Sequence, residues 1–464
     1  MRDVVDHSAR SSPARLAVTV FLGVCAIFTA LLLAPWATHS GRPAPFIDAL
    51  FTAISAVCVT GLTVVPTGSF WSPWGLAVII IAIKIGGLGI MTVASILGMA
   101  VSRRIGLTQR LLTASEKGVD KLGEVGALVR IVIITSTSLE VLIMLMLFPR
   151  FLTLHESWQE AAWRSVFYGI SAFNNAGFVP TPAGNAPYAQ DWMVLLPIAV
   201  GVFIGALGFP VILNILAVSK RRKHIKHMNR GRGRSVPMWR FWSVHTKLTL
   251  VTSAVLVVLG VVAYALMEWN NPETFGPMST GAKLLNSLFA SVMTRSGGFS
   301  TVEVGHMHEA TWLATDALMF VGGGSASTGG GIKVTTLAVM ILAIVAEARG
   351  DHDIECFRRR IPAGTTRLAI AVITVSTTLV LAATLALLEL TRFPLDRVIF
   401  EVLSAFGTCG LSTGITPYLP TGAKYVLCAL MFVGRTGTIT LAAALALRDR
   451  RRVIRYPEER PILG

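Results

Sequence analysis

Four glycines that share one sequence register constrain this chain more than any other feature. They recur at intervals of 116, 121 and 112 residues, and a bulky apolar residue follows each of them. Another bulky apolar residue stands ten positions before each glycine, and three of the four copies carry a Ser-Ala pair at one offset. The glycines are Gly61, Gly177, Gly298 and Gly410. Because the flanks agree as well as the glycines, we interpret the pattern as a fourfold internal repeat.

The composition of the 464 residues places the chain among proteins that cross a membrane several times. Hydrophobic residues make up 53%, charged residues only 14%, and mean hydropathy is +0.65, unlike large soluble domains. A helix that crosses about 30 Å of hydrocarbon needs roughly 20 apolar residues. Eight such stretches, two per repeat, begin near Leu16, Trp74, Ala127, Met193, Leu248, Leu313, Leu368 and Tyr425. The sequence therefore predicts an all-α polytopic membrane protein.

The net charge of +16 is concentrated between the repeats and at the C-terminal end. From Lys220 to Lys247 the chain has ten Lys or Arg residues and no acidic residue. Loops inside the repeats, such as 64–73 and 414–421, have no Lys or Arg. The positive-inside rule therefore predicts a multi-pass protein of the cytoplasmic (inner) membrane, with both termini and the inter-repeat loops in the cytoplasm. Topology explains the basic loop, so nucleic-acid binding is not indicated.

Between the long stretches of each repeat lies an apolar segment that is too short to cross the membrane. These segments have about 7 to 13 residues where a spanning helix needs at least ~17, so we predict re-entrant half-helices. They cover residues 49–57, 161–173, 282–293 and 400–406. Backbone that leaves a helix at membrane depth must be buried in protein or line a water-filled cavity. Four such turns in a pseudo-fourfold arrangement predict a central ion pathway, where glycine lets carbonyl oxygens face the ion.

The residues that lead into the four glycines carry no carboxylate. Uncharged linings favour cages of carbonyl oxygens and a monovalent cation such as potassium, whereas rings of Asp or Glu select by side-chain charge. The negative, C-terminal dipole ends of the half-helices also favour a cation. The alternative is that the glycines only permit tight helix packing. The predicted filter residues, with K⁺ bound at the glycines, are Val59, Thr60, Gly61, Asn175, Ala176, Gly177, Ser296, Gly297, Gly298, Thr408, Cys409 and Gly410.

Longer motifs around the same glycines carry a family resemblance. They read Val59-Thr60-Gly61-Leu62-Thr63, Phe173-Asn174-Asn175-Ala176-Gly177-Phe178, Thr294-Arg295-Ser296-Gly297-Gly298-Phe299 and Phe406-Gly407-Thr408-Cys409-Gly410-Leu411-Ser412-Thr413-Gly414. With them the chain resembles the Trk/Ktr/HKT superfamily of potassium transporters over nearly its whole length. Trk-type relatives usually carry a further helix pair before the first unit. In this sequence the first unit itself begins near Ala14. The resemblance is therefore greatest to Ktr-type membrane subunits, and it implies four helix, pore-helix, helix units folded from one chain.

A glycine-rich segment interrupts the second long stretch of the third repeat. Each of its six glycines costs a helix about 1 kcal/mol relative to alanine, so the helix must break there and face the aqueous pathway. A nucleotide-binding glycine loop is the rival interpretation, but it requires a preceding strand and a βαβ context. The resemblance implies an intramembrane gating loop beneath the filter. Its predicted residues are Gly322, Gly323, Gly324, Ser325, Ala326, Ser327, Thr328, Gly329, Gly330, Gly331 and Lys333.

Charged residues inside the predicted spans are costly and by default functional. Arg435 aligns with a glycine of the first repeat, and the resemblance places a matching arginine in the pathway near the loop. Arg435 would act as an electrostatic barrier, or it would hold the loop shut by donating hydrogen bonds to the loop's freed carbonyls. The alternative is that Arg435 snorkels to the interface. Arg295 is predicted to brace the filter from behind, since a cation on the axis would repel potassium. Asn174 is predicted to brace it in a similar way through its side-chain amide. The sequence assigns no role to Lys84.

The functional prediction is potassium uptake by the translocating subunit of a Ktr-type system, driven by the membrane potential, with sodium assistance left open. The chain has no Walker motif, catalytic triad or metal-ligand set, so we predict no enzyme activity and no organic cofactor. The resemblance implies a homodimer on a cytoplasmic ring of RCK-type, KtrA-like nucleotide-binding subunits. The alternatives are a sodium-selective or poorly selective transporter of the same fold and a non-conducting membrane scaffold. The roles of His306 and His308 are not assigned.

The same observations predict how the chain is divided. The four pore repeats cover 14–101, 127–219, 246–348 and 367–447. The parts predicted to be cytoplasmic are the N-terminus 1–13, the linker 102–126, the basic loop 220–245, the linker 349–366 and the tail 448–464.

Overall fold

The computed structural model describes residues 13–105, 121–154, 157–228 and 238–437. Within these ranges the chain is helical, apart from its connections and one hairpin of two three-residue strands. The predicted N-terminus, with the exception of Pro13, and the predicted tail 448–464 lie outside the described residues. The all-α membrane fold expected from composition is confirmed, with the small hairpin as an addition.

The chain forms four units, each with an opening helix, a short helix and a closing helix or helix pair. The opening helices are α2 (Pro13–Leu32), α7 (Lys121–Leu154), α11 (Val244–Glu268) and α15 (Ala363–Leu390). The short helices are α3 (Phe46–Val57), α8 (Trp158–Phe173), α12 (Thr280–Met293) and α16 (Leu395–Phe406). The closing helices are α5 (Pro73–Ile105), the pair α9 (Trp192–Leu207) and α10 (Phe209–Met228), the pair α13 (Glu309–Phe320) and α14 (Val334–Arg349), and α17 (Thr421–Phe432).

Smaller elements complete the described chain. They are α4 (Thr67–Phe70), a π-helical turn at Val433–Gly437, the strands β1 (Ile354–Cys356) and β2 (Arg359–Ile361), and 3-10 turns at Pro35–Ala37, Ala186–Tyr188, Met238–Phe241, Val304–His306 and Thr416–Tyr418. The hairpin lies in the predicted linker 349–366. Its strands are antiparallel, and Phe357 and Arg358 have φ of 49° and 62°, as a tight two-residue turn requires.

Four described helices are long and apolar enough to cross a membrane: Pro73–Ser95, Val129–Leu154, Val244–Glu268 and Ala363–Leu390. They correspond to the stretches predicted near Trp74, Ala127, Leu248 and Leu368. The pair α9–α10 meets the same test only when its two helices are taken together as one span, and it is bent by 95° at the break. The stretch predicted near Leu16 forms α2, of 20 residues. Those predicted near Leu313 and Tyr425 are shorter in the described structure, because α13 ends where the glycine-rich segment begins and α17 passes into the π-helical turn.

The short helices end where the sequence predicts, at residues 57, 173, 293 and 406, but they begin two to five residues earlier. Each first turn contains a polar or charged residue, so a search for an unbroken apolar run starts after it. Ser157 and Ser279 cap α8 and α12 by accepting hydrogen bonds from the N–H groups of Glu160 and Ala282. Pro45 and Pro394 precede α3 and α16.

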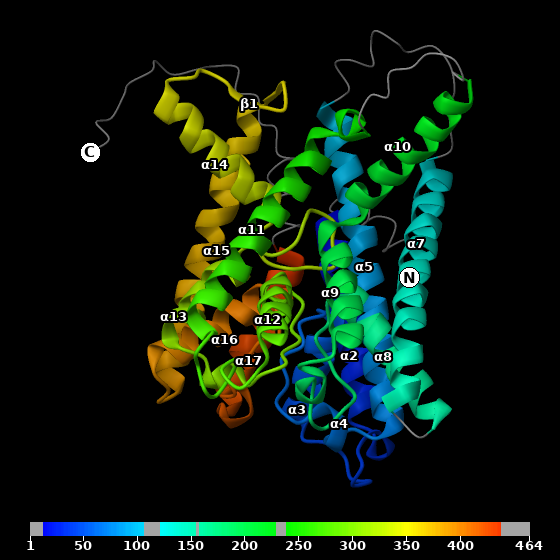
Figure 1. The fold of residues 1–464 in the computed structure, drawn as a ribbon. Helices are drawn as coiled ribbons and strands as arrows, with labels where there is room; N and C mark the ends of the chain where they lie inside the picture. Colours follow the sequence, from blue (N-terminus) through cyan, green and yellow to red (C-terminus); the bar gives the residue numbers. More distant parts are fainter. Residues whose placement is uncertain (1–12, 106–120, 155–156, 229–237, 438–464) are drawn as a thin grey trace.

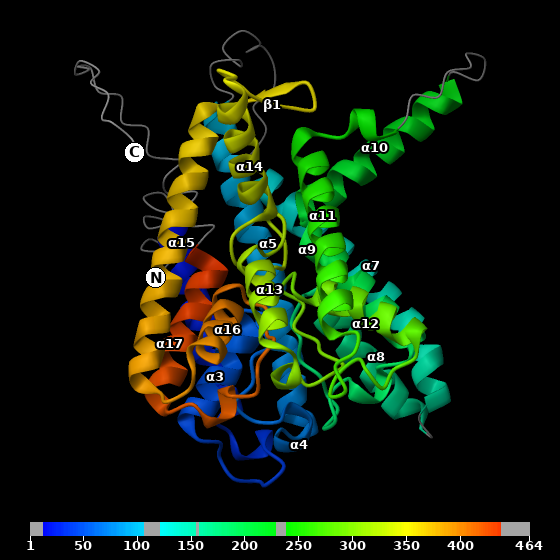
Figure 2. The ribbon, with the colours of Figure 1, turned by 60° about the vertical axis from the view of Figure 1, so that its left-hand side comes forward.

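Helix contacts close the four units into a ring. Each short helix packs against the opening helix of its own unit. The closing helix of each unit also contacts the short helix of the next unit, in the pairs α5 with α8, α9 with α12, α13 with α16, and α17 with α3. The short helices lie toward one end of the molecule, and β1 and α10 lie toward the other (Figures 1 and 2).

Candidate ion pathway

Each short helix leads directly into one of the four predicted filter segments. In three units the N–H of the residue before the glycine donates to the carbonyl five positions back. These bonds are Thr60 N to Ser55 O (2.7 Å), Ala176 N to Ser171 O (2.8 Å) and Cys409 N to Ser404 O (2.8 Å). In the third unit α12 ends one residue earlier relative to its glycine, and Gly297 N donates to Met293 O at 2.8 Å.

The backbone of all four segments has the same unusual conformation. Each glycine has a positive φ, between 69° and 93°, and so does the residue two positions before it. These earlier residues are Val59 (55°), Asn175 (61°), Ser296 (70°) and Thr408 (44°). Non-glycine residues rarely take positive φ, and such strain is concentrated at functional sites. Its recurrence at one position of every unit indicates that the surrounding fold enforces it.

The four glycines pack against one another in chain order and close on themselves. A Cβ atom added to any of them would meet the next segment, and one of the nearest atoms is always the carbonyl oxygen just before the next glycine. For Gly61, Gly177, Gly298 and Gly410 this oxygen belongs, in that order, to Ala176, Gly297, Cys409 and Thr60. Only residues without a side chain fit at these four positions, as the register predicts.

The Ser-Ala pair of the sequence repeat holds the filter segments in two units. Ser55 Oγ accepts the N–H of Gly61 at 3.1 Å, and Ser404 Oγ accepts the N–H of Gly410 at 3.0 Å. In the second unit, Ser171 Oγ instead donates to the Phe178 carbonyl at 2.8 Å. The third unit has Val292 at this position, and the N–H of its glycine reaches Met293 O at 3.4 Å. The third repeat, which lacks the serine in its sequence, therefore also lacks the serine hydrogen bond in the structure.

Two side chains three positions before a glycine extend to neighbouring helices. Arg295 is buried, and its Nη2 donates to the carbonyl of Leu318 on α13 at 2.8 Å. Asn174 Nδ2 donates to Glu140 Oε1 on α7 at 2.8 Å and to Ile170 O at 2.9 Å. Both contacts fit the predicted bracing role, in which the side chain holds the segment to an adjacent helix.

The glycine-rich segment separates α13 from α14 and packs against the break between α9 and α10. Gly324 N donates to Ala206 O at 2.7 Å, and Phe209 N donates to Ala326 O at 3.1 Å. Gly208 lies at the break with φ 93°, and a Cβ there would come within 2.5 Å of the Ser325 carbonyl oxygen. Sequence analysis predicts one long helix here, whereas the structure has two, because Gly208 takes a positive φ and Pro210 follows it.

The same loop also contacts three of the filter segments. Thr328 Oγ1 donates to Asn175 Oδ1 at 3.0 Å, and Gly330 N donates to Ser296 Oγ at 3.3 Å. A Cβ on Gly330 would overlap the side chain of Thr408. The predicted gating residues and the predicted filter residues are therefore in direct contact.

Arg435 reaches the loop from the π-helical turn after α17. Its side chain is 1% exposed, and Nη1 donates to the carbonyl of Thr328. Its Nε and Nη2 find no hydrogen-bond partner within the described ranges. Lys333 Nζ donates to the Gly329 carbonyl at 2.7 Å. Two cationic side chains thus hold successive parts of the loop, and the buried position of Arg435 does not fit the snorkelling alternative.

A cavity of about 440 Å³ lies beside the predicted filter. Its lining includes Gly298 and Gly410 together with the charged residues Glu303 and Arg397. His306 also lines it, with Nδ1 3.5 Å from Glu303 Oε2. Among the described residues, no group of three His, Cys, Asp or Glu side chains is arranged to hold a metal ion.

Comparison with known proteins assigns the family. The model of the family described as "TrkH: Cation transport protein" matches residues 17–451. The chain belongs to this family. In fold, the chain is also similar to the crystal structure of the potassium transporter TrkH from Vibrio parahaemolyticus, with a TM-score of 0.69 at 17% identity, over 92% of this chain and 83% of that one.

Two curated relatives of this cation transport family match almost end to end. The chain is 35% identical to Ktr system potassium uptake protein B of Bacillus subtilis, covering 100% of this chain and 99% of the relative. It is 31% identical to potassium/sodium uptake protein NtpJ of Enterococcus hirae, covering 98% of each. The predicted resemblance is thus confirmed.

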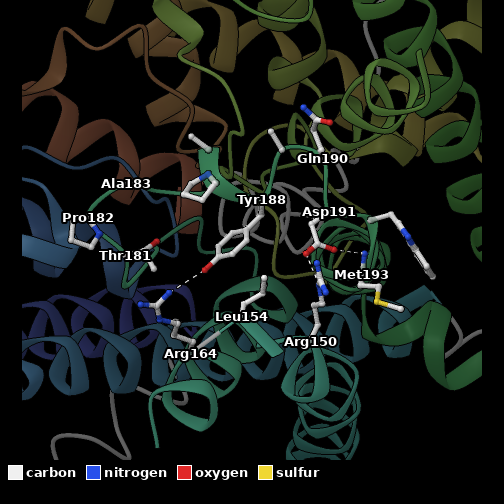
Figure 3. Close-up of a pocket in the computed structure, with 14 residues that line it drawn as sticks. Arg150, Leu154, Arg164, Thr181, Pro182, Ala183, Tyr188, Gln190, Asp191 and Met193 are labelled. Atoms are coloured by element: carbon white, nitrogen blue, oxygen red, sulfur yellow. Dashed lines mark hydrogen bonds and ion pairs between the residues drawn. The ribbon is translucent and has the colours of Figure 1, made fainter. Parts of the chain in front are cut away.

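A larger cavity, of about 1050 Å³, lies apart from the four glycines, beside the connection between α8 and α9 (Figure 3). Four of the polar side chains that line it pair with one another. Arg150 Nε lies 2.6 Å from Asp191 Oδ2, and Arg164 Nη1 donates to the Tyr188 hydroxyl at 3.1 Å. These contacts tie the connection to α7 and α8, which explains how it is positioned without a ligand.

Sequence analysis misses two buried carboxylates near the filter. Glu401 on α16 accepts hydrogen bonds from Ser412, Thr413 and Thr416, which follow the fourth filter glycine. Glu140 on α7 accepts from Asn174 and pairs with Lys84. The available signal was an acidic residue within an apolar helical segment, which by default is functional in a membrane.

Proposed function

We propose that this chain takes up potassium through the ring of filter segments, as the translocating subunit of a Ktr-type system. The observation that carries the proposal is the closed ring of four glycines, each of which faces a carbonyl oxygen of the next segment. Carbonyl oxygens can replace the hydration shell of a cation. The C-terminal ends of the four short helices lead into the ring, and their negative dipole ends favour a cation over an anion.

The proposed filter consists of the carbonyl oxygens of the four segments. Alternation between positive and negative φ turns successive peptide planes, so that neighbouring carbonyls can point to one side. The four segments contain no carboxylate, so discrimination would depend on the spacing and field of the carbonyl dipoles. This chemistry suits a weakly hydrated monovalent ion, and potassium fits it better than a divalent ion does.

The proposed gate is the loop 322–331 with Arg435. The loop contacts Asn175 and Ser296 and so occupies the space next to the filter. Arg435 and Lys333 donate to the Thr328 and Gly329 carbonyls of the loop, and backbone at membrane depth requires such partners. Between the two roles considered for Arg435, the hydrogen bond to Thr328 favours a latch on the loop. Opening would require this bond to break.

Two alternatives remain in the proposal. A sodium-selective or poorly selective transporter is the first, because the printed name of the NtpJ relative includes sodium; an assisting role for sodium belongs with it. The glycine at the centre of every filter segment favours potassium. A non-conducting scaffold is the second, and the retention of the same strained backbone in all four segments argues against it.

The assembly is also part of the proposal. The Bacillus subtilis relative is named as protein B of a Ktr system, so that system has further subunits. We propose a homodimer on a cytoplasmic ring of RCK-type, nucleotide-binding, KtrA-like subunits, with the membrane potential as driving force. The basic segments between units support a topology with both termini in the cytoplasm.

Complementation tests the proposal. The chain is expressed in a bacterial host that lacks its own potassium uptake systems, with and without a Ktr-type cytoplasmic subunit. We expect growth at low external potassium, and we expect replacement of Arg435 or of a filter glycine to alter it. Normal amounts of protein in the membrane without any potassium uptake in either strain would contradict the proposal.

A further inference from the structure

Lys84 has an ionic partner that the sequence does not reveal. It lies in the middle of the span Pro73–Ser95, and Glu140 lies near the middle of the span Val129–Leu154. Lys84 Nζ lies 2.5 Å from Glu140 Oε2 and 3.2 Å from Thr137 Oγ1. The Glu140 side chain is 2% exposed and that of Lys84 22%. An ion pair at this depth is costly, so its retention calls for a role.

Glu140 uses its second oxygen on the filter side. Oε1 accepts from Asn174 Nδ2 at 2.8 Å, so one carboxylate joins Lys84 on α5 to the residue that follows the last turn of α8. The other hydrogen of the Asn174 amide is directed to Ile170 O at 2.9 Å. With both amide hydrogens engaged, the side chain of Asn174 has one defined orientation.

Gly87 packs against the side chain of Asn174. It lies one helical turn after Lys84 on α5, and a Cβ at Gly87 would overlap Asn174 Oδ1. Asn174 is followed at once by Asn175, which has φ 61°, and then by Ala176 and Gly177. Displacement of Asn174 would therefore shift the strained part of the second filter segment directly.

The second unit also lacks the serine bond that holds the glycine N–H in units one and four. There, Ser55 and Ser404 accept the N–H of the filter glycine, whereas Ser171 donates to the Phe178 carbonyl. The position of Asn174 is occupied in the first and fourth units by Cys58 and Gly407, which have no comparable side chain. Side-chain bracing at this position thus occurs where the glycine N–H is not held by serine.

We propose that Glu140 is a positioning residue for the second filter segment, and that Lys84 holds its carboxylate toward Asn174. The pair contributes to the discrimination between potassium and sodium. This inference rests on the proposed function, because it assigns a role within the proposed filter. The competing interpretation is that the pair only joins α5 to α7 and stabilises the fold.

The test compares four variants in proteoliposomes, with the ratio of potassium to sodium flux and the melting temperature measured for each. Glu140→Leu removes both contacts, and we expect the ratio to fall by about tenfold, which corresponds to about 1.4 kcal/mol. Lys84→Met leaves an unpaired carboxylate, and we expect a smaller fall. The double variant Lys84→Met/Glu140→Gln is neutral and keeps an oxygen that can accept from Asn174. We expect it to restore the ratio to within about twofold of wild type.

Lys424→Met provides the matched control. Lys424 on α17 pairs with Asp48 at 3.2 Å, and the two side chains are 12% and 15% exposed. Asp48 is in the first turn of α3, at the end away from the filter. We expect this variant to lower the melting temperature while the flux ratio stays at its wild-type value.

The outcomes separate the inference from the proposed function. Wild-type protein that carries no potassium would contradict the proposed function itself. Wild-type protein that selects potassium, together with Lys84 and Glu140 variants that melt earlier but keep the wild-type ratio, would overturn the inference alone. If Glu140→Leu does not fold, Glu140→Ala, which also removes the acceptor for Asn174, replaces it, and an unchanged ratio in that variant and in Lys84→Met would be equally decisive.

Discussion

Replacement of Gly298 by serine tests the filter at one of the four glycine positions where the structure leaves no room for a side chain. Gly298 has φ 73°, and a Cβ there would lie 2.5 Å from the Cys409 carbonyl oxygen and 3.1 Å from the Gly177 Cα. Both neighbours belong to other filter segments. The substitution therefore acts on the second and fourth units as well as on its own.

Two energetic effects determine how strongly Gly298→Ser is expected to perturb the filter. A side chain at positive φ costs about 1–2 kcal/mol wherever it is placed. The overlap is specific to this site, because ordinary contact begins near 3.4 Å and the Cys409 oxygen would have to retreat by nearly 1 Å to reach it. A carbonyl that withdraws from the ring loosens the cage for the larger, weakly hydrated ion. We expect the preference for potassium over sodium to fall by at least about tenfold, or about 1.4 kcal/mol.

The assay is competitive flux into proteoliposomes, with Gly41→Ser as the matched control. Gly41 has φ 68°, and no heavy atom lies within 4 Å of a Cβ there, so this variant carries the backbone strain without the overlap. We expect Gly41→Ser to keep the wild-type flux ratio. A folded Gly298→Ser protein with an unchanged ratio would refute the assignment of the ring as the filter.

Three further predictions follow from the loop and the fourth unit. Deletion of residues 323–330 should raise cation flux in proteoliposomes, and flux at the level of the intact protein would contradict a gate there. Arg435→Gln removes the charged donor to the Thr328 carbonyl, so we expect flux to rise by about tenfold; a fall in flux would instead indicate that the arginine is needed for conduction. Glu401→Gln replaces with an amide the carboxylate that accepts four hydrogen bonds from the segment after the filter, and so weakens these bonds. We expect the free energy of unfolding to drop by about 1.5–3 kcal/mol, and an unchanged melting temperature would count against this anchor.

The features that depend on short stretches of sequence are predictable. The fourfold register identifies the glycines, and the length of the apolar segments shows that they cannot cross the membrane. The predicted ends of the short helices at 57, 173, 293 and 406 are confirmed. Their beginnings are predicted too late, because a polar or charged residue in each first turn interrupts the apolar run.

The features that depend on contacts between distant residues are not predictable in this way. Arg435 and Thr328 are 107 positions apart, and only the fold places the guanidinium on that carbonyl. Lys84 was evident as a charge inside a span, but its partner is 56 positions away. The break at Gly208 had a local signal, since Pro210 follows closely, and a glycine-proline pair within an apolar run deserves a test for a bent helix.

The central claim is that four segments of one chain form a potassium filter. It is tested most directly by flux of potassium, rubidium, sodium and lithium into proteoliposomes that contain the purified chain, with and without its cytoplasmic partner. The account predicts that potassium and rubidium pass readily, that sodium and lithium pass at least about tenfold more slowly, and that Gly298→Ser reduces this difference. Equal flux of all four ions through the wild-type protein, or no flux of any ion under either condition, would contradict it.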